Sequence, residues 1–275
     1  MTKSTFQVLT DNNLEVNGDI YYNSPSDAQI LIVSHGFKAY RNWGFFPYMC
    51  EQFAKSNLIV VNIDFSLNGI VDEEKGLFDV EKFRKVTVTQ EILDLNTVIS
   101  KLPDILGEEL KSNWNSKVSL LGHSLGGAVS IITAANRDDL TSVVTWGSIG
   151  DIDRNTDRQK EEWRKKGVME FENRITKQNL ILDVNYLEDK LINKEKYNLE
   201  INAAKLDIPL LILHGSSDFT VRLHEAKMLH NAANQSQLSI IDRANHTFNS
   251  RHPFTGANKY LDEAISETIK FLGVN

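Results

Sequence analysis

The sequence predicts an α/β fold with a mostly parallel central sheet, helices on its flanks and an inserted helical cap. Two observations carry this prediction. From residue 30 onward, short apolar runs alternate with longer amphipathic stretches, a pattern typical of parallel sheets that are covered on both faces. Over residues 151–205 the alternation stops, and this length exceeds what an ordinary crossover connection needs.

The expected elements follow one another along the chain. Residues 6–9 and 14–22, joined across 11–13, predict an antiparallel hairpin. Short apolar runs bounded by polar residues then predict buried strands; they cover residues 30–34, 58–63, 117–121, 143–146, 210–213 and 238–241. Apolar residues at three- and four-residue spacing predict amphipathic helices; these cover 81–102 and 260–272, and the stretches 43–55 and 126–135 are also expected to be helical.

The segment at about 151–205 opens with a dense run of charges and continues with scattered apolar residues such as Ile175, Leu182 and Leu187. Long insertions in such folds are usually functional, and ligands of α/β sheets bind at the carboxyl ends of the strands. We therefore expect a cap above the site, within a single domain that spans residues 1–275. The alternative is a helical excursion that packs away from the site.

Composition limits the partners and the compartment. The 275 residues carry a formal net charge of −7, which argues against nucleic acid and anionic membranes as partners. A single cysteine, Cys50, allows no intrachain disulfide. Asp11 and Glu15 interrupt the N-terminal region before a signal peptide's apolar segment could form. We expect a cytoplasmic protein; composition leaves its oligomeric state open.

Residues 122–126 have the sequence Gly-His-Ser-Leu-Gly and connect a predicted strand to a predicted helix. This is the G-x-S-x-G pattern, in which a serine sits on a tight strand-to-helix turn. Glycine is needed two residues either side because a side chain there would clash with neighbouring backbone. The turn aims the serine at a helix N-terminus, where free N–H groups stabilise an oxyanion. Ser124 is therefore the predicted nucleophile.

A serine nucleophile needs a base, and the base needs an orienting acid. Asp218 lies in the loop after the next-to-last predicted strand, and His246 follows the last one. The chain order Ser…Asp…His is that of the α/β-hydrolases. We predict His246 as the base and Asp218 as the acid, with Asp151 and Asp242 as alternatives for the acid.

The loop after the strand 30–34 begins with His35-Gly36-Phe37. In this architecture one oxyanion donor comes from that loop and the other from the residue after the nucleophile. The predicted donors are the backbone N–H groups of Phe37 and Leu125. Gly36 lets the backbone approach the substrate carbonyl, and we expect His35 to hold the loop by hydrogen bonding.

These motifs resemble those of α/β-hydrolases of the esterase, lipase and serine-aminopeptidase-like group. The chain is similar in particular to compact bacterial carboxylesterases, including cinnamoyl and feruloyl esterases, over nearly its whole length. The resemblance implies the α/β-hydrolase fold, cleavage of small-molecule esters and no cofactor. One feature departs from many relatives: residues 64–70 (Asp-Phe-Ser-Leu-Asn-Gly-Ile) keep only a remnant of a glycine-rich Asp-x-x-Gly-x-Gly-x-Ser turn.

The predicted chemistry is hydrolysis of a carboxylic ester through an acyl-enzyme intermediate. We expect no metal, since the histidines lack a His-Glu-x-x-His arrangement. An amidase or aminopeptidase, a thioesterase, and a non-enzymatic small-molecule binding protein remain alternatives. A peptidase would need acidic side chains for the substrate amine, and the insertion offers Glu161, Glu162, Glu170 and Glu172.

Other residues near the motifs have structural explanations. Trp43, Phe45, Phe46 and Tyr48 follow the oxyanion loop and would either line a substrate pocket or anchor a helix in the core. His123 is expected to pack or hydrogen-bond beneath the serine turn. His252 is assigned to surface structure and not to a second base.

Overall fold

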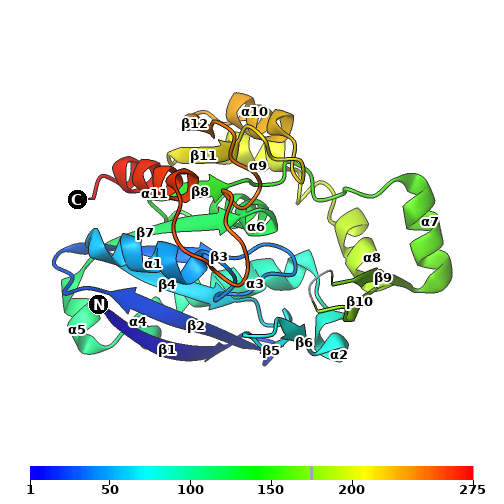
Figure 1. The fold of residues 1–275 in the computed structure, drawn as a ribbon, viewed down its shortest axis with the longest axis horizontal. Coiled ribbons are helices and arrows are strands. Elements are labelled where there is room, and N and C mark those ends of the chain that lie inside the picture. The colour runs from blue at the N-terminus through cyan, green and yellow to red at the C-terminus, as the bar shows by residue number, and fades with distance from the viewer. Residues whose placement is uncertain (174–175, 275) are drawn as a thin grey trace.

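An eight-stranded sheet runs through the centre of the molecule (Figure 1). The structure is a computed structural model and describes residues 1–173 and 176–274. In spatial order the strands are β1 (Thr2–Leu9), β2 (Glu15–Tyr22), β4 (Leu58–Asp64), β3 (Ala28–Ser34), β7 (Trp114–His123), β8 (Ser142–Trp146), β11 (Leu210–Gly215) and β12 (Ser236–Ile241). Strand β2 is antiparallel to both neighbours, and the other pairings are parallel. This sheet confirms the predicted mostly parallel α/β-hydrolase fold.

The central strands match the sequence prediction because they are buried on both faces. Every residue of β3, β4, β8 and β11 is buried, so each appears in the sequence as a continuous apolar run. The N-terminal hairpin is also confirmed, with Leu9 paired to Glu15 in the antiparallel register of β1 and β2.

Helices cover both faces of the sheet (Figure 1). One face carries α1 (Phe46–Lys55) and α11 (Lys259–Leu272); the other carries α3 (Val88–Ser100), α6 (Leu125–Ala134), α9 (Leu199–Lys205) and α10 (Leu223–Ala232). Side chains of β3 alternate between the two cores: Ile30 and Ile32 join the α3–α6 side, and Leu31 and Val33 join the α1–α11 side.

The predicted single helix over residues 81–102 is wrong in one respect, since the chain forms α2 (Val80–Phe83) and α3 here, and Leu102 already begins α4 (Leu102–Ile105). Thr87 has an extended backbone (φ −143°), and its side chain accepts a hydrogen bond from Gln90 N. Such an N-cap starts a new helix and interrupts the periodic pattern. Helix α1 begins at Phe46, later than the predicted residue 43, with Pro47 in its first turn.

Between β8 and β11 the chain leaves the sheet and forms the inserted segment, which lies at the right of Figure 1. It contains α7 (Asp157–Lys166), β9 (Val168–Glu172), β10 (Asn179–Asp183) and α8 (Val184–Ile192), followed by α9. The sequence predicts helices here and does not indicate the antiparallel β9–β10 pair that the structure shows. Ile175, which it also assigned to the insertion, lies outside the described residues. Helix α9 packs against α6 and α10, so the projecting part runs from α7 to α8.

Smaller elements complete the chain, namely β5 (Ile70–Asp72), β6 (Leu77–Phe78), α4 (Leu102–Ile105) and α5 (Glu108–Asn113). Within the described ranges, the structure has no helix whose length and apolar character would let it cross a membrane.

Candidate active site

Ser124 occupies the turn between β7 and α6 with φ 56° and ψ −118°. Residues other than glycine rarely adopt this conformation, which costs on the order of 1–3 kcal/mol and persists only when its surroundings impose it. Ser124 N donates to Trp146 O (2.9 Å), and Gly127 N donates to Ser124 O (3.1 Å). The backbone of β8 and the first turn of α6 therefore hold the serine in place.

The glycines of the turn are required by close backbone contacts. A Cβ atom at Gly122 would lie 2.1 Å from Gly126 O, and one at Gly126 would lie 2.4 Å from His35 O. Because both neighbours are backbone atoms, neither contact can be relieved by turning a side chain. The steric explanation of the G-x-S-x-G pattern thus agrees with the structure.

The loop after β3 passes directly against the serine. A Cβ at Gly36 would lie 2.9 Å from Ser124 Cβ, which brings the neighbouring Phe37 to the serine side chain. Leu125 is the first residue of α6, so its N–H has no partner within the helix. The residues of the two predicted oxyanion donors, Phe37 and Leu125, both border a hollow that Ser124 lines.

His35 holds this loop, as predicted. Its Nδ1 donates to Gly36 O (2.9 Å) and its Nε2 accepts from Phe65 N (3.3 Å), which sets the neutral tautomer. Burial lowers the pKa of His35 to about 4. The side chain is therefore an uncharged brace between the loops after β3 and β4.

Asp218 and His246 form a direct pair. His246 Nδ1 lies 2.7 Å from Asp218 Oδ2, and Asp218 Oδ1 accepts from Thr220 N (2.8 Å) and Val221 N (2.9 Å). Burial alone would raise the pKa of Asp218, but the hydrogen bond and attraction from His246, with the Val221 N–H, hold it below its usual value. The carboxylate is thus ionised and fixed in orientation.

The two alternative acids lie elsewhere. Asp151 accepts a hydrogen bond from Asp153 N (2.8 Å), and Asp242 accepts one from Ser216 Oγ (3.2 Å). Asp242 is 82% exposed at its side chain. Of the three candidates the structure brings Asp218 to His246.

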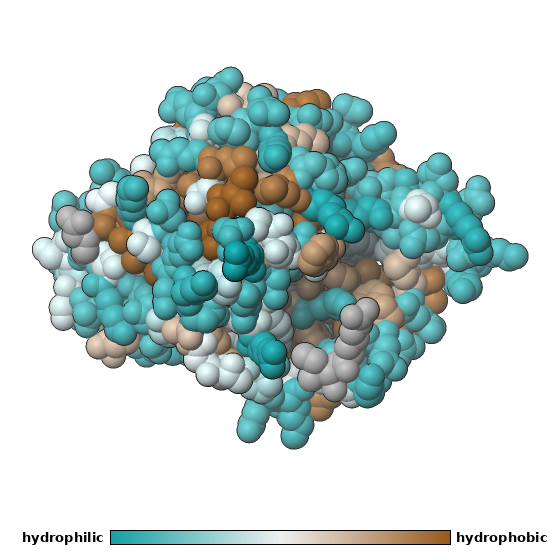
Figure 2. Space-filling model, turned by 45° about the horizontal axis from the view of Figure 1, so that its top comes forward, coloured by the Kyte–Doolittle hydropathy of each residue, from teal (hydrophilic) through white to brown (hydrophobic). Residues whose placement is uncertain are grey.

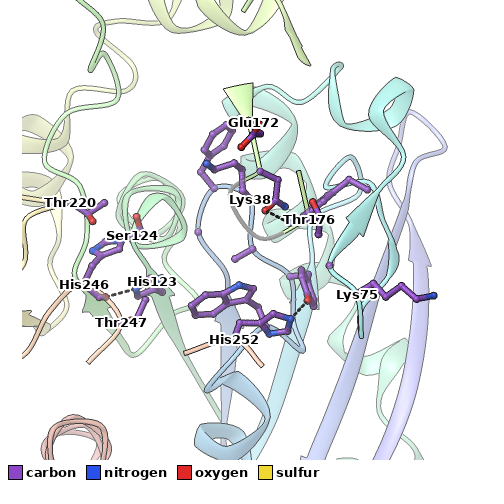
Figure 3. Close-up of a pocket in the computed structure, with 18 residues that line it drawn as sticks. Lys38, Lys75, His123, Ser124, Glu172, Thr176, Thr220, His246, Thr247 and His252 are labelled. Atoms are coloured by element: carbon purple, nitrogen blue, oxygen red, sulfur yellow. Dashed lines mark hydrogen bonds between the residues drawn. The ribbon is translucent and has the colours of Figure 1, made fainter. Parts of the chain in front are cut away.

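Ser124 and His246 line the same two hollows, and Figure 3 shows their side chains next to each other on one side of the first. Since Nδ1 of His246 is engaged by Asp218, Nε2 is the ring nitrogen available to a hydroxyl. Gly147 lies beneath the Asp–His pair with φ +54°, and a Cβ there would come within 3.2 Å of His246 Nδ1. A side chain at residue 147, just after β8, would therefore have a strained backbone and would crowd the pair.

Two further histidines support this arrangement from below. His123 Nε2 donates to His246 O (2.9 Å), and burial lowers the pKa of His123 to about 3, so the prediction that it packs beneath the turn is confirmed. His214 Nε2 donates to Val221 O (3.0 Å), beside the Asp218 carboxylate. His214 is not among the site residues predicted above; the signal for it in the sequence is a polar residue at the end of an apolar run.

Two hollows meet at Ser124. The first, here the loop-side hollow, measures about 490 Å³; its walls include Phe37, Lys38, Tyr40, Trp43, Phe78, Glu172 and His252. The second, here the insertion-side hollow, measures about 420 Å³; its walls include Leu125, Ile149, Ile152, Trp163, Met169, Phe171, Leu182 and Tyr186. Both volumes suit small ligands. Figure 2 shows hydrophobic residues gathered in the recess between the main body and the inserted segment.

The aromatic residues after the oxyanion loop divide between the two expected roles. Trp43 lines the loop-side hollow, whereas Phe45 and Phe46 are fully buried in the core. Tyr48 of α1 stacks on Phe254, which lies in the segment before α11. The sequence could not separate these roles because all four residues belong to one short apolar stretch.

His252 lies in the wall of the loop-side hollow and is more than surface structure. Its Nδ1 accepts from Gly44 N (3.0 Å) and its Nε2 lies 2.9 Å from Tyr40 Oη, which in turn donates to Glu73 O (2.7 Å). Trp43 stacks on the His252 ring. The side chain ties together three segments of the wall, across the hollow from the inserted segment.

The acidic residues that a peptidase would need are mostly elsewhere. Glu172 lines the loop-side hollow and pairs with Lys177 (2.9 Å), and Glu161 is exposed on α7. Glu162 and Glu170 line a separate outer depression. Among the residues the structure describes, no group of three or more His, Cys, Asp or Glu side chains is placed to hold a metal ion.

A protein-family model described as "Putative esterase" matches residues 13–267. The chain belongs to this esterase family. This membership agrees with the resemblance found from the motifs, and it points to ester hydrolysis. No curated protein sequence matches the chain.

Solved structures share its fold at low sequence identity. Est1E from Butyrivibrio proteoclasticus with bound ferulic acid is 16% identical, with a TM-score of 0.70 and 97% of each chain covered. GrgF, an α/β hydrolase from Penicillium sp. sh18, is 15% identical with a TM-score of 0.75 and 99% and 98% coverage of this chain and that one. An esterase from Pyrococcus furiosus is 16% identical with a TM-score of 0.64 and 99% and 91% coverage. At these identities the likeness concerns the fold.

Proposed function

We propose that this esterase-family chain is a serine hydrolase that cleaves carboxylic esters through an acyl-enzyme intermediate. The observation that carries the proposal is the 2.7 Å contact between His246 Nδ1 and Asp218 Oδ2, beside a serine held in a strained turn. A strained serine and an oriented histidine in one hollow, with a buried acid bonded to the histidine, are the parts that acyl transfer needs.

In the proposed mechanism, His246 Nε2 takes the proton of Ser124 Oγ as this oxygen attacks the ester carbonyl. The N–H groups of Phe37 and Leu125 stabilise the resulting oxyanion. His246 then protonates the departing alcohol oxygen, and the acyl group remains on Ser124. Water, deprotonated by His246, attacks the acyl-enzyme and releases the acid. Throughout, Asp218 holds the tautomer of His246 and stabilises its charged form.

The surroundings of Ser124 favour esters over peptides. A free substrate amine would need an unneutralised carboxylate near the serine, and Glu172 is paired with Lys177. The insertion-side hollow is mainly apolar and aromatic, which suits the acyl or alkyl part of an ester. The assay below distinguishes ester hydrolysis from amide or thioester cleavage by the same residues and from ligand binding without turnover.

We further propose that the insertion at about 151–205 acts as a cap on one α/β-hydrolase domain. In support, Trp163 of α7, Phe171 of β9, Leu182 of β10 and Tyr186 of α8 line the hollow that contains Ser124. Core residues form its opposite wall. A substrate in this hollow would lie between the sheet and the insertion.

The test is the hydrolysis of 4-nitrophenyl esters from acetate to decanoate by the unmodified protein and Ser124→Ala. We expect turnover that falls by roughly 10³-fold or more in the variant, because the remaining rate comes only from binding and the oxyanion donors. Ser112→Ala, at an exposed serine of α5, is the matched control and should keep full activity.

A fluorophosphonate probe separates the alternatives. Labelling of the unmodified protein, but not of Ser124→Ala, would show an activated serine even if the ester series were poorly chosen, and peptides and thioesters would then be assayed. Absence of both labelling and turnover would contradict the proposal and leave the binding protein.

A further inference from the structure

The walls of the insertion-side hollow carry positive charge only. Lys38, Arg154 and Lys190 line it, and among the described residues of its lining none is acidic. This contrasts with a chain whose formal net charge is −7. Arg154 is neutralised outside the hollow by Glu225, at 2.5 Å. The distinctive group is Lys190.

Lys190 belongs to α8 and is only 4% exposed. Its Nζ donates to Asn155 Oδ1 (2.7 Å) and lies over the rings of Trp163 (5.7 Å) and Tyr186 (5.2 Å). Asn155, Trp163 and Tyr186 all line the insertion-side hollow. The ammonium group is therefore located at an aromatic end of this hollow.

The protein neutralises this ammonium incompletely. Asp153 Oδ1 is 4.0 Å away, and the same carboxylate pairs closely with Lys160. Burial lowers the pKa of Lys190 although Asp153 and Asp151 act in the opposite direction, so nearby carboxylates do not compensate for the lost water. Asp153 is shared by two lysines, and on its other side Lys190 borders a neighbouring hollow that Asp151 and Asp153 also line. Within the lining of the insertion-side hollow, its charge meets no carboxylate.

We propose that the insertion-side hollow binds the part of an ester that ends in a carboxylate, with Lys190 as the residue that recognises this anion. The inference rests on the proposed function and names its substrate class: a monoester of a dicarboxylic acid, or an ester of an ω-hydroxy acid. The apolar and aromatic walls contact the connecting chain of the substrate, and the Lys190 ammonium binds the carboxylate at the end of that chain. Because folding has already removed water from the ammonium, an incoming carboxylate gives up only its own hydration.

The experiment compares two ester series of matched chain length on the unmodified protein. One series is 4-nitrophenyl monoesters of succinate to suberate, and the other is the corresponding neutral 4-nitrophenyl alkanoates. A second pair, acetate esters of ω-hydroxy acids against alkyl acetates, covers the case in which the alcohol part occupies the hollow. At one chain length in one of these pairs, we expect the anionic ester to have a kcat/KM about tenfold or more above its neutral match.

Lys190→Met keeps the length of the side chain and removes its charge. It should lower kcat/KM for the preferred anionic ester by about 10- to 100-fold, mainly through KM, since a hydrogen bond to a charged group is lost. Neutral esters should change by less than about threefold, because the apolar walls remain. Lys165→Met, at an exposed lysine of α7, makes the same change in net charge outside the hollow and should affect neither series.

Binding separates a failure of this inference from a failure of the proposed function. Monomethyl adipate is titrated calorimetrically into Ser124→Ala and into Ser124→Ala combined with Lys190→Met. Lys190-dependent binding without any ester turnover would refute the hydrolase and support the anion site. Neutral esters hydrolysed as well as anionic ones, with equal effects of Lys190→Met on both, would overturn the anion site and leave the hydrolase intact. The comparison on the unmodified protein stands even if the variant fails to fold.

Discussion

The serine turn and the inserted segment meet at the same hollow but are built differently. Around Ser124 the contacts are between backbone atoms, as at Gly122 and Gly126, where no Cβ fits. The insertion instead contacts the main body largely through side chains, such as Arg84 with Asp183 and Thr89 with Asp189, beside a backbone bond from Asp183 N to Arg84 O. A backbone constraint admits one local conformation, whereas side-chain pairs can be exchanged. We therefore expect substitutions near the turn to abolish activity and those in the insertion to tune it.

The largest expected effect is that of Asp218→Asn. The amide oxygen can still accept from Thr220 N and Val221 N, so the loop should keep its fold. An amide no longer stabilises the charged form of His246 and favours the wrong tautomer, and we expect kcat to fall by roughly 10³- to 10⁴-fold. Ester hydrolysis at saturating substrate measures this fall.

The alternative acids supply the controls. Asp151→Asn and Asp242→Asn remove the same charge from residues that do not contact His246, and both should stay within about twofold of full activity. A loss at Asp242→Asn as large as that at Asp218→Asn would reassign the acid.

An intermediate effect is expected on the free energy of unfolding at acidic pH, and we attribute it to His35. Its pKa is about 4 in the folded protein and about 6.5 when unfolded, so the stability that its neutral form contributes is complete above pH 6.5. This contribution is lost as the pH falls from 6.5 to 4, and amounts to about 3 kcal/mol at most. Urea unfolding of the unmodified protein and His35→Gln from pH 7 to pH 4 should therefore show a gap in unfolding free energy that narrows with acidity.

Comparing the unmodified protein with His35→Gln isolates the contribution of His35 to the free energy of unfolding. Asp94, whose pKa burial raises to about 6, acts in the opposite sense, but it is present in both. His224→Gln, at an exposed histidine of α10, is the matched control and should run parallel to the unmodified protein. A gap that stays constant with pH would show that His35 does not carry the acid sensitivity.

The sequence predicted most of what lies at the carboxyl edge of the sheet. Strands such as β3 and β11 are buried on both faces, so their apolar runs are unambiguous, and the G-x-S-x-G turn follows from backbone sterics alone. The candidate residues Ser124, Asp218 and His246 follow the carboxyl ends of β7, β11 and β12, which run parallel in one sheet, and this brings them to one edge. Strand burial and turn sterics each act on a few consecutive residues, and the fold uses both repeatedly, so short stretches of sequence were sufficient to predict this edge.

The insertion escaped prediction because tertiary contacts decide its structure. Strand β9 has only half-buried and exposed residues, and β10 buries only Leu180 and Leu182 of its five, too weak a pattern to indicate strands. Lys190 was not singled out because nothing in the sequence shows that this lysine of α8 turns toward Trp163 and Asn155. The division of Trp43 from Phe45 and Phe46 likewise depends on where the loop runs.

The smallest expected effect is that of Trp163→Ala in the insertion, and it tests whether this segment forms a substrate wall. Trp163 is 3% exposed, stacks on Tyr186 and donates from Nε1 to Leu182 O (3.3 Å). Its removal should raise KM for 4-nitrophenyl octanoate roughly five- to tenfold, as expected for about 1 kcal/mol of lost apolar contact. The acetate ester is too short to reach this wall, so its KM should change less than about twofold.

Trp114→Ala, at a tryptophan that starts β7 and lies outside both hollows, should leave the two values unchanged. Equal changes for acetate and octanoate would mean that the insertion supports the fold of the site without contacting the substrate, and Ser124 would then act in a hollow bounded by the main body alone.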